Sequence, residues 1–152
     1  MSELPYVLRP IPTDKAEELR DAGGPVFVAN EHPGFPCRQC LLDAEVGEEL
    51  ILVSHDPFTG NSKYRSASPI FLHRVGCQLA FNPSDLPTQL TSRQLSVRSF
   101  DKDEMMIDAA VIDGDELESK IESFFDDVQS ETIHVHNATR GCWAVTIERR
   151  AA

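Results

Sequence analysis

Hydrophobic and polar residues alternate with a period of two over residues 131–148. Alternation of this kind is typical of strands with one buried face, so the stretch predicts a β-hairpin with its turn at residues 137–141. Similar but shorter patterns predict the other strands, at residues 6–11, 26–29, 37–42, 50–54, 69–74, 95–100 and 105–112. The polar stretch 55–68 is predicted to be a long loop, and loops of that length are often functional or mobile.

The register of the predicted hairpin decides which of its side chains share a face. Pairing of His136 with Cys142 places Val135 opposite Trp143, and the face that carries Trp143 is then expected to form the core. His134 and His136 lie with Cys142 on the other face. A slip of one residue would destroy this grouping, because every side chain of the strand would change face.

One later segment, residues 114–128, has the apolar spacing of an amphipathic helix. Its apolar residues fall at positions i, i+4, i+7, i+8 and i+11, namely Leu117, Ile121, Phe124, Phe125 and Val128. A minor helix is predicted over residues 14–22, after the N-cap candidate Thr13 and before Gly23. The predicted fold class is therefore α+β, with a mostly antiparallel, curved β-sheet packed on one main helix.

Length and composition fit an ordinary globular protein: 152 residues, 41% hydrophobic and 26% charged, expected to form a single domain over residues 1–152. A net charge of −11 without a basic cluster argues against partners such as nucleic acid or an anionic membrane. An interaction domain that binds a basic partner through the acidic surface stays open as one interpretation. The sequence shows no apolar run of membrane-spanning length and no secretory signal, so a cytoplasmic location with reduced cysteines is expected.

Histidine and arginine side chains suggest a pocket for an anionic small molecule. Guanidinium groups suit carboxylates and phosphates because they donate charge-assisted hydrogen bonds in a fork that matches these anions. The predicted ligand-binding residues are His134, His136, Asn137, Arg38, Arg65 and Arg140. The sequence predicts no cofactor, and it leaves open the reaction, the oligomeric state and whether the protein is an enzyme.

The alternative hypothesis is a thiol- or metal-dependent protein. Cys37 and Cys40 form a C-x-x-C motif, which occurs in redox sites and in zinc knuckles. No long helix is predicted after the motif, as a thioredoxin-like site requires, and the glycine usual in a zinc knuckle is missing. Cys77 and Cys142 stand alone, without a Cys or His at knuckle spacing. The sequence therefore predicts no metal, and the runner-up ligands are Cys37, Cys40, His134, His136 and Cys142.

Four distinctive segments from about Glu31 onward carry a resemblance to a known family. They read HPGFPCRQCLLDAEVGEELILVSHDP, KYRSASPIFLHR, SVRSFDKDEMMIDAAVIDG and TIHVHNATRGCWAV. Together they resemble the bacterial domain-of-unknown-function family 1203. The resemblance implies a small, stand-alone bacterial protein of the cytosol, and it brings no activity, cofactor or catalytic residue with it.

Overall fold

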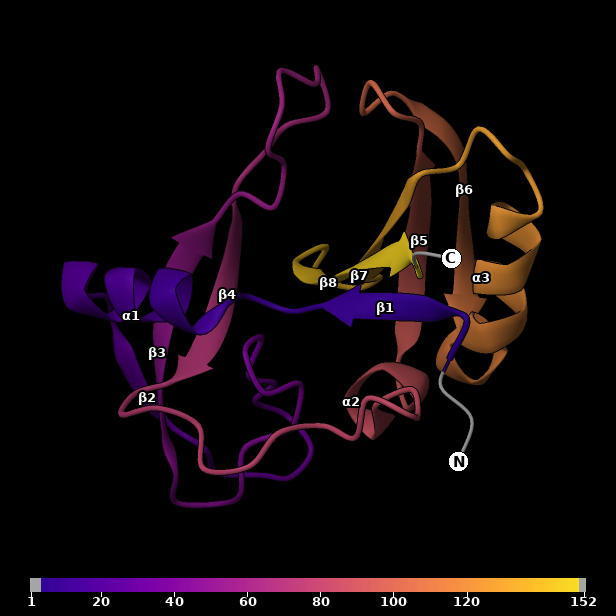
Figure 1. Ribbon diagram of the computed structural model, residues 1–152. Helices are drawn as coiled ribbons and strands as arrows, with labels where there is room; N and C mark the ends of the chain where they lie inside the picture. The colour runs from indigo at the N-terminus through magenta and orange to yellow at the C-terminus, as the bar shows by residue number, and fades with distance from the viewer. Residues whose placement is uncertain (1–3, 151–152) are drawn as a thin grey trace.

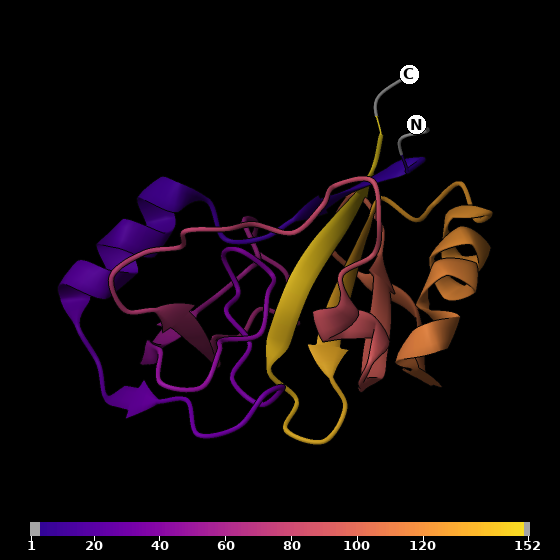
Figure 2. The same cartoon turned by 90° about the horizontal axis from the view of Figure 1, so that it is seen from below.

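Two antiparallel sheets are built from the eight strands found in residues 4–150, the part of the chain that the computed structural model describes (Figures 1 and 2). The five-stranded sheet has the order β1 (Tyr6–Arg9), β8 (Trp143–Arg149), β7 (Thr132–Asn137), β5 (Gln94–Phe100) and β6 (Met106–Asp113). The three-stranded sheet has the order β2 (Val26–Val28), β3 (Glu49–His55) and β4 (Ser68–His73). The predicted α+β class is confirmed, and the strands divide between two sheets.

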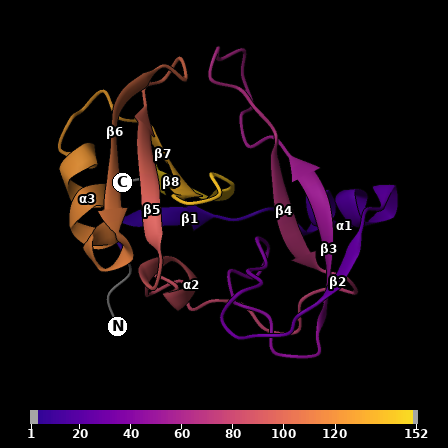
Figure 3. The same cartoon turned by 180° about the vertical axis from the view of Figure 1, so that it is seen from behind.

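The helices flank these sheets. α1 (Thr13–Ala22) follows β1, and the single-turn α2 (Thr88–Thr91) precedes β5. A short 3-10 turn, η1 (Gly114–Glu116), leads into α3 (Leu117–Phe125), which covers the face of the five-stranded sheet that points away from the smaller sheet (Figures 1 and 3). The main helix predicted from residue 114 thus begins as expected, but it ends at Phe125. None of the helices in residues 4–150 is long and apolar enough to cross a membrane.

The larger core lies between α3 and the five-stranded sheet. Leu117 and Ile121 of α3 are fully buried in the same cluster as Val97, Ile133 and Val135 of the sheet. Each such side chain contributes roughly 1.5–3 kcal/mol through burial. The alternation in β7 therefore leaves His134 and the residues that share its face pointing toward the second sheet.

The hairpin of β7 and β8 has a different register from the one predicted. Val135 pairs with Val145, and His136 pairs with Trp143, with a bulge between the two pairs. A bulge inserts one unpaired residue and reverses the direction of the side chains beyond it. The expectation that Trp143 shares the core face of Val135 is therefore wrong, because Trp143 packs in the second core with Ala16 of α1.

The long loop between β3 and β4 bridges the two sheets at one end of the molecule (Figures 1 and 3). The backbone N–H of Gly60 donates to the Glu104 carboxylate at 2.8 Å, and the Ser62 hydroxyl donates to the Glu104 carbonyl at 2.6 Å. Phe58 packs edge-on against Phe100, with ring centroids 5.2 Å apart. The loop is thus anchored on the turn between β5 and β6.

Glu104 has a left-handed backbone with φ of 59°, which costs a residue with a Cβ about 1 kcal/mol relative to glycine. Both Glu104→Ala and Glu104→Gly remove the carboxylate that holds the loop. The difference in stability between the two variants therefore measures the cost of the left-handed backbone alone. Urea denaturation is expected to show Glu104→Gly as the more stable variant by about 1 kcal/mol. Equal stability of the two variants would contradict the left-handed conformation.

Candidate metal centre

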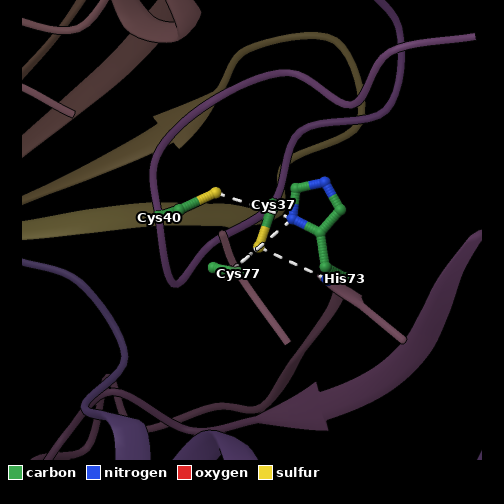
Figure 4. Close-up of side chains that lie close together, drawn as sticks. All are labelled: Cys37, Cys40, His73 and Cys77. Carbon is green, nitrogen blue, oxygen red and sulfur yellow. Dashed lines mark hydrogen bonds between the residues drawn. The ribbon is translucent and has the colours of Figure 1, made fainter. Parts of the chain in front are cut away.

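Four side chains that are far apart in the sequence converge beside the three-stranded sheet (Figure 4). Cys37 and Cys40 lie in the loop between β2 and β3, His73 ends β4, and Cys77 follows it. The three Sγ atoms and a ring nitrogen of His73 all lie within 4.8 Å of one another. We call this set the Cys3His cluster.

The separations in the cluster match the edges of a tetrahedron around a zinc ion. Zinc–sulfur bonds of about 2.3 Å and zinc–nitrogen bonds of about 2.0 Å place S···S pairs about 3.8 Å apart and S···N pairs about 3.5 Å apart. The Cys37 and Cys77 sulfurs are 3.6 Å apart, and His73 Nδ1 lies 3.6 Å from the Cys40 sulfur and 3.7 Å from that of Cys77. All four cysteines of the chain are free thiols.

The first half of the cluster is a tight turn over residues 37–42, which we call the knuckle. The backbone N–H of Leu41 donates to the Cys37 carbonyl, and the Cys37 N–H donates to the Leu42 carbonyl, both at 3.1 Å. Leu41 takes the left-handed conformation, with φ of 59°, at the position where a glycine is usual. Its side chain is fully buried in the larger core, and this burial offsets the backbone strain. The predicted strand over residues 37–42 is therefore wrong, because the chain folds back on itself here.

The second half of the cluster was missed by the sequence reasoning. His73 and Cys77 are joined by a turn in which Gly76 has φ of 108°, and the Gly76 N–H donates to the His73 carbonyl. The H-x-x-x-C spacing falls within the ligand spacings that zinc sites use. The expectation that Cys77 stands without a Cys or His at zinc-ligand spacing is wrong, because His73 lies four residues before it.

Hydrogen bonds within the cluster lower the pKa of one thiol and raise that of another, because those to Cys37 and Cys77 raise the pKa of Cys40. Hydrogen bonds from the side chains of Cys40 and Cys77 hold the pKa of the Cys37 thiol far below its usual value. Hydrogen bonds to Cys37 and Cys77 in turn raise the pKa of His73 to about 10. Without a metal ion, a histidine proton balances the thiolate, and a bound divalent cation would displace that proton.

Groups around the cluster orient its ligands. The Glu48 carboxylate lies 3.2 Å from His73 Nε2, which leaves Nδ1 facing the sulfurs in the manner of a carboxylate–histidine–metal triad. The His73 backbone N–H donates to the Cys37 sulfur at 3.4 Å. Arg20 of α1 donates to the His73 carbonyl at 2.8 Å and to the Gln39 side chain at 2.6 Å. A divalent ion bound by three thiolates would leave a net negative charge, and this cation would offset that charge.

The cluster is also reachable from outside. A cavity of about 720 Å³ is lined in part by Cys40 and His73, and a second cavity of about 540 Å³ is lined in part by Cys40 and Cys77. A metal ion can therefore enter without unfolding of the sheet.

The histidines and Arg38 of the predicted anion pocket lie elsewhere, between the two sheets. His134 and His136 share one face of β7, as predicted, because Ile133 and Val135 point into the larger core. His136 Nδ1 donates to the Gly141 carbonyl at 2.8 Å, so its Nε2 accepts from Arg98 at 3.4 Å.

Arg38 also reaches this region from its place inside the knuckle. Its guanidinium donates to the Gln89 side chain at 2.8 Å and approaches the Cys142 sulfur at 3.9 Å. Asn137 Nδ2 lies 3.7 Å from the same sulfur. We call the following set the arginine–histidine cluster: Arg38, Arg98, His134, His136, Asn137 and Cys142.

The structure does not bring the other two predicted arginines into this cluster. Arg65 donates to the Asp56 carboxylate at 2.6 Å and to the Gly60 carbonyl at 2.7 Å, within the loop between β3 and β4. Arg140 is exposed in the turn between β7 and β8. Cys142 contacts Arg38 and Asn137, and it is not a member of the Cys3His cluster.

Both buried histidines are held neutral. Burial lowers the pKa of His134 to about 3, and repulsion from Arg98, and from His136 whenever that ring is protonated, lowers it further. Burial also lowers the pKa of His136 to about 4, and both Arg98 and Arg38 lower it further. His136 uses both ring nitrogens in hydrogen bonds, so it is not placed as a general base for Cys142.

Comparison with known proteins identifies a family. The family model described as a protein of unknown function (DUF1203) matches residues 34–149, which include all four ligands of the Cys3His cluster. The chain belongs to this family. Comparisons with curated proteins and with solved structures find no match.

Stability is expected to fall in acid partly because of His134. An unfolded histidine takes up a proton below pH 6.5, while the folded His134 stays neutral down to about pH 3, so stability present above pH 6.5 is lost as the pH falls. Between pH 7.5 and 5.0 this one site costs about 2 kcal/mol. Urea denaturation at both pH values measures the loss of stability between them. This loss is expected to be about 2 kcal/mol smaller for His134→Leu than for the wild type. Equal losses would contradict the neutral, buried state of His134.

Proposed function

We propose that this member of the DUF1203 family is a zinc-binding protein that holds one ion in its Cys3His cluster. The observation that carries the proposal is the set of S···S and S···N separations, 3.6–3.7 Å, which fit a tetrahedron of zinc ligands. Thiolate and imidazole are ligands that zinc prefers, whereas calcium and magnesium require oxygen. The carboxylate of Glu48 on His73 supplies the outer hydrogen bond that such sites use.

The role proposed for the metal is structural. Four protein ligands complete a tetrahedral coordination sphere, whereas a catalytic zinc keeps one position for water or substrate. The ligands come from the knuckle loop, from the end of β4 and from the turn after it. A bound ion would therefore cross-link the loop between β2 and β3 to the far edge of the small sheet.

A cytoplasmic location is part of the same proposal. Zinc binds thiolates, so the cluster requires cysteines that stay reduced, as they do in the cytoplasm. The four free thiols support this location. Cys37 and Cys40 are fully buried, which suits permanent ligands better than exchange with a redox partner.

Elemental analysis of protein purified without added metal tests the proposal directly. We expect one zinc per chain in the wild type, and loss of that zinc in Cys77→Ser because a serine hydroxyl is a poor ligand at neutral pH. Cys142→Ser is the matched control, and it is expected to keep its zinc. A wild-type protein that neither contains zinc nor binds it on titration, or equal loss in both variants, would refute the centre.

The hydrogen bond from His73 to Glu48 gives a second, finer test. Glu48→Gln keeps the shape of the side chain but removes the charge that orients the imidazole, so metal affinity is expected to fall about 10- to 100-fold. Glu49→Gln removes a neighbouring carboxylate that pairs with Arg74 instead, and its affinity is expected to match the wild type. Competition with a chromophoric chelator measures both, and equal affinities for the two variants would exclude the triad.

A further inference from the structure

We propose that the arginine–histidine cluster is a second site, which binds a small oxyanion of the carboxylate or phosphate class. This site is distinct from the metal centre, and its evidence does not require the metal. Four kinds of observation support it: unpaired positive charge, neutral histidines, buried polar atoms without partners, and partial exposure on one side.

The first observation is a buried guanidinium that forms no ion pair with a carboxylate, although Asp43 lies close enough to favour its charge. Arg38 is only 1% exposed, and the two hydrogen-bond partners of its guanidinium are the Gln89 amide and the Cys142 sulfur. The buried carboxylate of Asp43 is already paired with Arg93, at 2.7 Å. Burial of a charge without a counter-charge is costly, so a ligand that neutralises Arg38 would bind favourably.

A second guanidinium adds to this charge. Arg98 donates to the Ser96 hydroxyl at 3.2 Å and to His136, and within residues 4–150 no carboxylate forms an ion pair with Arg98 or Arg38. Both arginines lie close enough to His136 to lower the pKa of its ring. The chain as a whole carries a net charge of −11. The two arginines beside His136, which pair with no carboxylate, therefore form a positively charged region in an acidic protein.

Two members of the cluster carry buried polar atoms without partners. His134 Nδ1 and Asn137 Oδ1 have no hydrogen-bond partner, and His134 is only 3% exposed. Buried polar atoms are nearly always paired, so an unpaired one marks the place of a ligand or an ordered water. A neutral His134 with its proton on Nδ1 can donate to an oxyanion without adding charge.

The side of the cluster nearest the β7–β8 turn is partly open. Arg98, Asn137 and Cys142 are half-buried, whereas the other three members are buried. On the far side the ring of His134 is closed in by Phe58 and Phe100, with centroids 4.7 and 4.8 Å away. An oxyanion would therefore enter beside Asn137 and accept hydrogen bonds from the two guanidinium groups.

Calorimetric titration with inorganic phosphate and with citrate, each against chloride at matched ionic strength, tests the site. Arg98→Gln removes one charge-assisted donor and is expected to weaken binding by about tenfold or more. Arg140→Gln makes the same charge change on the exposed turn, and its affinity is expected to stay within about twofold of the wild type. Binding of phosphate alone or of citrate alone would assign the anion class.

A measurement on the wild type alone locates the anion. Long-range ¹H–¹⁵N spectra are expected to show the imidazole signals of His134 and His136 moving as anion is added. Absence of binding by both anions, equal weakening in the two variants, or unmoved imidazole signals would each overturn the site. Zinc content is measured in every sample, so loss of the metal centre is distinguishable from failure of the anion site.

Discussion

Convergence of three thiols and one imidazole on a single point joins the knuckle to the edge of the smaller sheet. That sheet has three strands, and the side chains of its edge strand β2 are largely exposed. Its core, which contains Ile51, Ile70 and Leu72, is smaller than the core beneath α3. Metal ligation in isolated zinc fingers contributes about 10–16 kcal/mol of folding free energy, far more than any one side chain here. With the proposed ion bound, the Cys3His cluster would hold the knuckle, β4 and the following turn together.

The knuckle contributes residues to both proposed sites, because its side chains point in two directions. Cys37 and Cys40 face the metal centre, while Arg38 between them reaches the other way, to Gln89 and Cys142 near the five-stranded sheet. Leu41 inserts its side chain into the larger core and thereby fixes the fold of the loop. A change at the metal centre would thus be felt at Arg38 through a few covalent bonds, without any need for movement of the sheets.

Patterns in the sequence predicted the local elements well, because period-two and helical spacing report directly on which face of a strand or helix is buried. The strands at residues 50–54 and 95–100 and the helix from residue 114 all form. The division into two sheets could not be predicted, since no local pattern states which strands pair. The bulge at Ala144, beside Trp143, leaves no signal in the sequence, so the face predicted for the Trp143 side chain was wrong.

The same limits apply to the sites. The C-x-x-C motif was visible, but a missing glycine argued against a knuckle, whereas the burial of Leu41 allows it the conformation that glycine normally takes. The common face of His134 and His136 followed from alternation alone. Arg98 could be assigned to His136 only through the pairing of β5 with β7.

X-ray absorption at the zinc edge tests the central claim most directly, because it counts ligands by element and distance. The account predicts a first shell of three sulfurs at about 2.3 Å and one nitrogen at about 2.0 Å. A shell of nitrogen and oxygen, or one with four sulfurs that includes Cys142, would contradict the Cys3His centre and the fold of the knuckle with it.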